Sequence, residues 1–243
     1  MSGSKAALVL LPGFLCDGTV WAEQMEALSD VAEATCAEYG LLDSLPAMAE
    51  RVLATAPERF SVAGHSMGGR IAFEIFRQAP GRVERLAAFN TGALPRSPGE
   101  AGAEEERGRR ALLAVARSSG MRAMALQWIP GMVAPGRTRD GALVESIVRM
   151  FERKTPDIFE AQMNALLGRP DATGILGAIR CPALLLSGRE DRWSPPAAHE
   201  QMAARMPNAR VAIVPDSGHM SAMEQPAAVA QAMREWLSQP PLS

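Results

Sequence analysis

Residues 60–69, with the sequence FSVAGHSMGG, constrain the fold of this chain more than any other segment. A short apolar run ends among glycines, with Ser66 between them, and a run with helical apolar periodicity follows at once. A chain that passes so directly from a buried strand to a helix must turn sharply, and glycines beside the turn leave room for neighbouring backbone. The segment therefore predicts a strand, a tight turn and a helix, with the serine hydroxyl exposed above the strand end.

The rest of the chain alternates between strand and helix patterns. Apolar runs predict strands at residues 6–11, 31–39, 59–63, 83–89, 183–186 and 210–214. Helical periodicity predicts helices at residues 19–28, 45–56, 68–79, 195–206 and 223–237. This alternation predicts an α/β protein with a mainly parallel sheet of about six strands, flanked by helices.

The alternation is interrupted after the fourth predicted strand. Residues 95–170 contain no convincing strand, but helical patterns at 109–117, 121–128, 141–154 and 156–167, separated by prolines. We therefore predict a helical cap at residues 95–170, inserted into a core made of residues 1–94 and 171–243. Most apolar cap residues are expected to pack helix against helix, whereas Trp128 and Met132 flank a proline-containing turn and are expected to line a substrate pocket.

Composition excludes several classes of protein. The 243 residues carry a formal net charge of −2, which gives no general attraction to nucleic acid or anionic membrane. The three cysteines are scattered, so neither a disulfide framework nor a metal site is expected. Because neither a signal peptide nor an apolar run of bilayer length is evident, we expect a cytoplasmic protein without a membrane span.

Three residues with complementary chemistry follow predicted strands. Ser66, Asp191 and His219 occur in that order, and the carboxyl ends of parallel strands share one edge of the sheet. A serine hydroxyl needs a base to become a nucleophile, and a histidine base needs an acid to orient it. We predict Ser66 as nucleophile, His219 as base and Asp191 as acid, against the alternative of a capping serine, a loop histidine and a helix-leading acid.

Neighbouring polar residues fit these roles less well. His65 adjoins the serine but should point elsewhere, and His199 lies on a predicted surface helix, where it should be solvated. Glu190 should point away from the site, and Asp216 is too close to His219 in sequence to reach its far ring nitrogen. The end of the fourth strand carries Asn90 rather than a carboxylate.

Acyl transfer at a serine also needs hydrogen-bond donors for an oxyanion. The amide of Met67, directly after the serine, should supply one. The loop after the first strand should supply the other through the amide of Phe14, with that of Leu15 as a fallback, and Gly13 leaves space there. The ring of Phe14 is expected to line the pocket.

These motifs together resemble those of the α/β-hydrolase superfamily. The resemblance rests on LLPGFLCDGTVW, GHSMGG, LLSGREDRWSPP and VPDSGHMSAMEQP, and it spans nearly the whole chain. The chain is most similar to the small, cofactor-free, single-cap members, among them carboxylesterases of the pimeloyl-carrier methyl esterase type, enol-lactonases, perhydrolases and carbon–carbon hydrolases. It departs from many relatives in having Pro12 where they have histidine, and the usual leading antiparallel hairpin is not evident.

The resemblance implies a serine esterase that needs no cofactor or metal and acts on a small, largely apolar ester through an acyl-enzyme. A thioesterase, a lactonase or a carbon–carbon hydrolase with the same triad stays open, as does a ligand receptor without enzymatic activity. An acyl carrier protein is a weaker alternative as partner. The cap arginines that such a carrier, or a carboxylate, could contact are Arg107, Arg109, Arg110, Arg117, Arg122, Arg137 and Arg139. Glutamates at 104–106 favour instead a solvated surface of mixed charge.

Overall fold

Within residues 5–241, which the computed structural model describes, six strands form one parallel sheet. The strands are β1 (Ala6–Leu11), β2 (Ala32–Cys36), β3 (Phe60–His65), β4 (Val83–Phe89), β5 (Ala183–Gly188) and β6 (Ala209–Val214). Their order is β2-β1-β3-β4-β5-β6, and every neighbouring pair is parallel. The predicted fold class is confirmed. The first four and last two residues of the predicted core lie outside the described residues.

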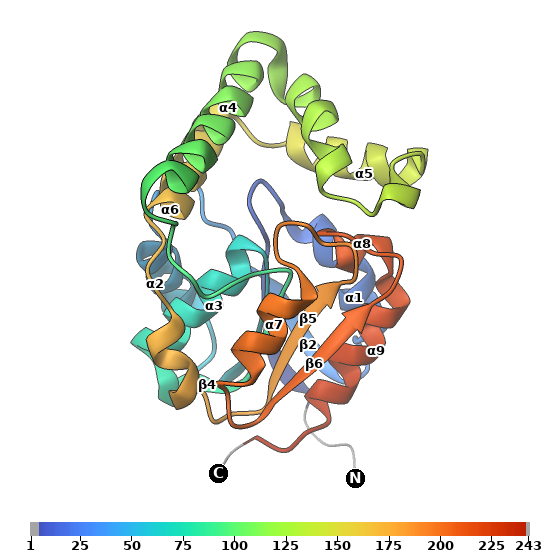
Figure 1. Cartoon of the computed structure of the whole chain (residues 1–243). Coiled ribbons are helices and arrows are strands. Elements are labelled where there is room, and N and C mark those ends of the chain that lie inside the picture. The colour runs from blue at the N-terminus through green and yellow to red at the C-terminus, as the bar shows by residue number, and fades with distance from the viewer. Residues whose placement is uncertain (1–4, 242–243) are drawn as a thin grey trace.

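Helices cover both faces of this sheet. They are α1 (Ala22–Ala27), α2 (Leu45–Thr55), α3 (Met67–Gln78), α7 (Pro196–Ala203), α8 (Ser221–Glu224) and α9 (Pro226–Leu237). Figure 1 shows α1 and α9 on one side of the sheet and α2, α3 and α7 on the other. All residues of the central strands β3 and β5 are buried, which explains why their sequences are apolar runs without alternation.

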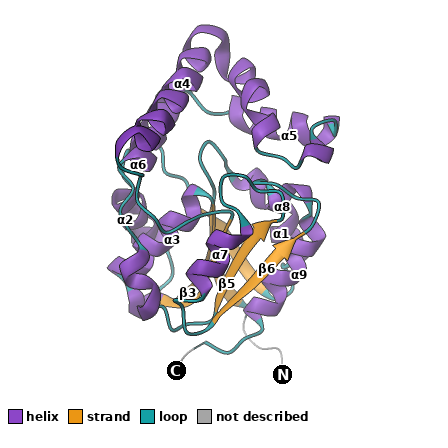
Figure 2. Cartoon of the chain, in the orientation of Figure 1, coloured by secondary structure: helices purple, strands orange, loops and turns teal. Residues whose placement is uncertain are grey.

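A further group of helices lies between β4 and β5 in the chain. It contains α4 (Gly99–Trp128), α5 (Gly141–Glu152) and α6 (Pro156–Leu167). In Figure 2 the arrows of β5 and β6 point toward these helices, which therefore lie over the carboxyl edge of the sheet. Any ligand at the ends of the strands would lie beneath them.

The sequence-based prediction is right about one helix break and wrong about another. The predicted segments at 109–117 and 121–128 both lie in α4, and Gly120 (φ 87°, ψ 164°) interrupts the helical backbone between them as predicted, although α4 begins earlier, at Gly99. The predicted closing helix at 223–237 is divided into α8 and α9 at Gln225 (φ −136°, ψ 60°). The following Pro226 explains this break, because proline disfavours helical backbone at the preceding residue.

Candidate active site

Ser66 occupies a sharp turn between β3 and α3. Its backbone angles, φ 54° and ψ −113°, lie in a region that L-residues rarely adopt. A Cβ atom on Gly64 would lie 2.2 Å from the carbonyl oxygen of Gly68, and one on Gly68 would lie 2.1 Å from that of Leu11. The glycines are thus required by close backbone approach, and the turn is held by a 2.8 Å hydrogen bond from the Ser66 amide to the Phe89 carbonyl.

This backbone strain predicts a difference in stability between two inactive variants. Ser66→Gly and Ser66→Ala both remove the hydroxyl, but only glycine adopts this conformation without steric cost. Relief of the backbone strain in Ser66→Gly, about 1–3 kcal/mol, exceeds the entropic penalty of introducing glycine, about 0.5–1 kcal/mol. We expect Ser66→Gly to be the more stable by about 1 kcal/mol in urea unfolding. Equal midpoints and slopes for the two variants would show that the turn stores no strain.

Ser66, His219 and Asp191 form one hydrogen-bonded chain. The Nε2 atom of His219 lies 2.8 Å from the Ser66 Oγ atom, and its Nδ1 atom lies 2.9 Å from Oδ2 of Asp191. A carboxylate can only accept, so Nδ1 carries the proton and Nε2 accepts from the serine hydroxyl. The three sequence-predicted residues are therefore together, with the histidine in the tautomer that can take a proton from the serine.

The carboxyl of Asp191 is held in its ionised form. Burial opposes ionisation, but electrostatic interaction with His219 and hydrogen bonds from His219, Asn90 and the Ser194 amide together lower the pKa of Asp191 to about 2. Asn90 donates from Nδ2 to Oδ2 of Asp191 at 2.9 Å and to the Gly218 carbonyl at 3.1 Å. Asn90 thus fixes both the acid and the loop that carries the histidine.

The other two histidines, His65 and His199, are buried and form hydrogen bonds with the backbone. His65 directs Nε2 at the His219 carbonyl oxygen, 2.7 Å away, so this nitrogen donates. Burial, with the nearby His219, lowers the pKa of His65 to about 3, which keeps the ring neutral. The prediction that His199 is solvated was wrong. It is fully buried, and Nε2 accepts from the Thr91 amide at 3.2 Å, because α7 turns this side chain toward the sheet.

A buried glutamate holds the histidine loop. Glu224 accepts from the amides of Gly218 (2.9 Å) and Met220 (3.1 Å) through Oε1, and from that of Ala134 (2.7 Å) through Oε2. The amide of His219 itself donates to the Met132 carbonyl at 2.6 Å. These bonds tie the segment around Ala134 directly to the loop that positions His219.

Two unpaired backbone amides lie at the predicted oxyanion positions. Within residues 5–241, neither the amide of Phe14 nor that of Met67 has a hydrogen-bond acceptor. The fallback donor, Leu15, is occupied, because its amide donates to Oε1 of Gln162 in α6 at 2.7 Å. The structure therefore favours Phe14 over Leu15 as the donor from this loop.

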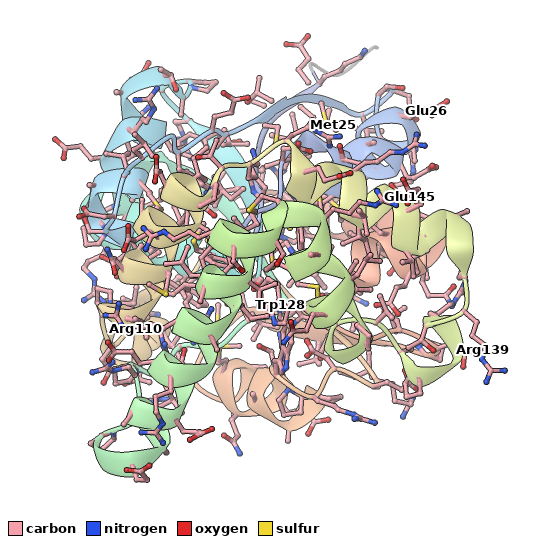
Figure 3. All side chains as sticks on the ribbon, turned by 90° about the horizontal axis from the view of Figure 1, so that it is seen from above. Met25, Glu26, Arg110, Trp128, Arg139 and Glu145 are labelled. Atoms are coloured by element: carbon pink, nitrogen blue, oxygen red, sulfur yellow. The ribbon has the colours of Figure 1, made fainter. Side chains whose placement is uncertain are left out.

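A cavity of about 490 Å³ opens beside Ser66. Its lining includes His219, Trp128 and Trp193, and the two indoles stack with ring centroids 5.4 Å apart. Figure 3 shows Trp128 near the middle of the molecule when it is viewed from above. The ring of Phe14 is buried and packs edge-on against Trp128, with the ring centroids 5.5 Å apart. Of the three predicted pocket residues, Trp128 is among those that line this cavity, whereas Phe14 and Met132 are buried and are not.

Sequence reasoning missed several residues of this site. Asn90 was noted only as the absence of a carboxylate, and Glu224 was not singled out. Trp193, two residues after the acid, packs edge-on against the His219 ring, with the ring centroids 4.9 Å apart. Arg70, four residues after the serine, lines the cavity. Helical spacing from Ser66 was the one signal that could have revealed Arg70.

Neither a metal centre nor a membrane helix is found in the described part of the chain. Among residues 5–241, no group of three or more His, Cys, Asp or Glu side chains could hold a metal ion. No helix within that range combines the length and the apolar character needed to cross a membrane.

The chain is similar in sequence and in structure to known hydrolases. The family model described as "Alpha/beta hydrolase family" matches residues 8–232. A pimeloyl-[acyl-carrier protein] methyl ester esterase from Nitrosomonas europaea is 27% identical over 228 residues, which cover 90% of each chain. A putative carbamate hydrolase from Caulobacter sp. (strain K31) is 26% identical, covering 98% of this chain and 92% of its own.

Solved structures of hydrolases also resemble this chain. A thermophilic esterase from Thermogutta terrifontis, with malate bound, superposes with a TM-score of 0.84 and is 31% identical, covering 97% of this chain and 90% of its own. The enol-lactonase from Burkholderia xenovorans LB400 superposes with a TM-score of 0.83 at 24% identity, covering 98% of this chain and 93% of its own, which supports the fold alone.

Proposed function

The chain belongs to the alpha/beta hydrolase family, and from this we propose that it is a serine hydrolase that cleaves a carboxylic ester through an acyl-enzyme. The observation that carries the proposal is the chain of hydrogen bonds from Ser66 through His219 to Asp191, with distances of 2.8 and 2.9 Å. Relatives named as esterases, including one that is 31% identical, support ester bonds as the target.

In the proposed first half-reaction, Ser66 Oγ attacks the ester carbonyl carbon while Nε2 of His219 takes the hydroxyl proton. The carbonyl oxygen becomes an oxyanion, which the amides of Phe14 and Met67 stabilise. Collapse of this intermediate breaks the bond to the alcohol, and His219 returns the proton to the departing oxygen. Asp191 keeps the imidazole oriented and stabilises its cationic form.

The second half-reaction repeats this sequence with water. His219 removes a proton from a water molecule, which attacks the acyl-enzyme carbonyl carbon. The acid is released as the Ser66 oxygen recovers its proton from His219. No cofactor is needed for either half-reaction. We propose that residues 95–170 act as the cap that covers these steps, since α4 and α6 supply residues to the cavity lining.

The proposed substrate is a small ester rather than one borne on a carrier protein. The relative from Nitrosomonas europaea is named for a carrier-bound substrate. Along α4, however, exposed arginines already pair with glutamates: Arg107 with Glu100 and Glu104, and Arg110 with Glu106. This surface has mixed charge and offers little net attraction to an acidic carrier. Reaction in the cytoplasm is likewise part of the proposal.

A substrate panel with an active-site probe tests this function. We expect a fluorophosphonate to label the wild-type protein, and aryl esters to be hydrolysed more efficiently than acyl-CoA thioesters, lactones or β-diketones. If thioesters, lactones or β-diketones are hydrolysed more efficiently than aryl esters, the same triad cleaves that type of bond instead. Negligible turnover of every class, together with tight binding of a small molecule, would identify a receptor instead.

A further inference from the structure

The cavity beside Ser66 contains three arginines. Arg70 of α3, Arg109 of α4 and Arg169, which follows α6, all contribute to its lining. Its lining also includes Glu104 and Glu105. Because guanidinium groups stay charged near neutral pH and are expensive to bury without partners, the acceptors available to each one decide what this cavity can bind.

Of these three arginines, Arg70 is the one that has no carboxylate partner in the part of the chain that the structure describes. Its Nη1 atom donates to the Leu94 carbonyl at 2.8 Å, and within residues 5–241 neither Nε nor Nη2 has an acceptor. Burial, followed by the charge of Arg169, lowers the pKa of Arg70 to about 9, against the opposing charge of Glu105. The group is still protonated at neutral pH, and two of its nitrogens are available to a ligand.

The other two arginines share one carboxylate. Arg169 donates to both oxygens of Glu105 at 2.8 Å, and Arg109 donates to Oε1 of the same residue at 3.1 Å. The buried Nε atom of Arg169 has no acceptor within residues 5–241. Glu104 instead pairs with the exposed Arg107. The lining therefore carries three guanidinium groups and two carboxylates, which leaves a net excess of one positive charge.

The position of Arg70 relative to the nucleophile limits the ligand. Arg70 follows Ser66 by four residues, and its amide lies 3.4 Å from the Ser66 carbonyl oxygen in the first turn of α3. The two Cα atoms are therefore separated by about 6 Å along the helix axis. Ser66 and Arg70 line the same cavity, so one small ligand in it can contact both side chains.

We propose that the substrate is an ester that also carries a carboxylate, and that Arg70 binds this carboxylate while Ser66 attacks the ester carbonyl. This inference rests on the proposed function and specifies its substrate class. The planar fork of arginine matches a carboxylate, which would supply the missing acceptors and reduce the excess charge of the cavity. The cavity volume of about 490 Å³ accommodates the ester of a short-chain acid.

Paired substrates differing only in charge test this proposal. Monomethyl glutarate and methyl glutaramate place a carboxylate or a neutral amide on the acyl side. Acetoxypropionate and its amide place them on the alcohol side. We expect the wild-type protein to prefer the carboxylate member of at least one pair by about tenfold or more in kcat/KM, and the preferred pair identifies the side. Arg70→Met should reduce that preference to about one, mainly by raising KM for the carboxylate substrate.

Matched variants separate binding from structural support. Arg110→Gln removes an arginine on α4 that pairs with Glu106 and is exposed at the side of the molecule (Figure 3), and it should retain the wild-type preference. Arg70→Lys keeps the charge and should restore part of the preference lost in Arg70→Met. If Arg70→Met slows both members of a pair equally, Arg70 supports only the Leu94 carbonyl and the proposal is wrong.

The failure of this proposal differs from failure of the proposed function. A protein that hydrolyses the neutral esters as well as the charged ones is an esterase without a carboxylate site. A protein that hydrolyses none and resists the fluorophosphonate is not a serine hydrolase. If Arg70→Met does not fold, the wild-type protein can be tested by asking which compounds protect Ser66 from the fluorophosphonate. Glutarate should slow labelling at concentrations at which glutaramide does not. Equal protection by the two compounds would overturn the carboxylate site.

Discussion

Ser66→Ala is expected to lower kcat/KM for ester hydrolysis by at least about 10⁴-fold and to abolish fluorophosphonate labelling. The variant loses the only atom that can form the acyl-enzyme in the proposed mechanism, while His219, Asp191 and the two free amides remain in place. Water attack assisted by these remaining groups is far slower than attack by an activated serine, which sets the size of the loss. Probe labelling and steady-state hydrolysis of an aryl ester measure the two effects.

Ser118→Ala provides the matched control, because Ser118 is an exposed serine of α4 far from the turn in sequence. It should label and turn over like the wild-type protein. An Ser66→Ala protein that still labels fully and still hydrolyses esters would refute the nucleophile assignment. Loss of activity in both variants would point to a general effect of serine replacement on folding, which circular dichroism would show.

Asp191→Asn is expected to lower kcat by about 10³- to 10⁴-fold, with a smaller change in KM. An amide at this position can donate to Nδ1 of His219, which favours the tautomer with its proton on Nε2 and removes the acceptor for the serine hydroxyl. It would also place a second amide opposite Nδ2 of Asn90, which now donates to Asp191 at 2.9 Å. Kinetics of the variant with an aryl ester, compared with the wild-type protein, measures the loss.

The same substitution should change the acid sensitivity of folding. The pKa of Asp191 is about 2 in the folded protein and about 3.9 in an unfolded chain, so its ionised form stabilises the fold above about pH 4. This contribution, about 2 kcal/mol, is lost as the pH falls from about 4 to about 2. Urea unfolding should therefore show the stability difference between wild type and Asp191→Asn shrinking by about 1 kcal/mol from pH 7 to pH 3. A difference independent of pH would contradict the low pKa.

Much of the fold follows from patterns that are local in sequence. The apolar runs of β3 and β5 are continuous because both faces of these strands are buried, so they stand out without any knowledge of their partners. The break at Gly120 in α4 also agrees with the prediction, because the helical patterns stop at 117 and resume at 121. The division of the last helices was missed, because it depends on a single backbone position, the residue before Pro226.

Residues that depend on how one element faces another could not be predicted. His199 was expected in solvent because it lies on a predicted surface helix, yet packing of α7 turns it toward the Thr91 amide. Three consecutive glutamates on α4 looked equivalent in sequence. In the structure only Glu105 contacts Arg169, because the rotation of α4 beside the end of α6 directs it inward.

The sequence by itself determined the parallel α/β architecture and brought Ser66, Asp191 and His219 to one edge of the sheet. It could do so because strand periodicity is local and chain order places every strand end on the same side. Only the tertiary structure decided which neighbours those residues have: Asn90 on the acid, Glu224 on the histidine loop, and Arg70 with no carboxylate partner among residues 5–241. Hydrogen bonds and ion pairs depend on distances of a few ångströms between segments far apart in the chain, and no local pattern encodes those distances.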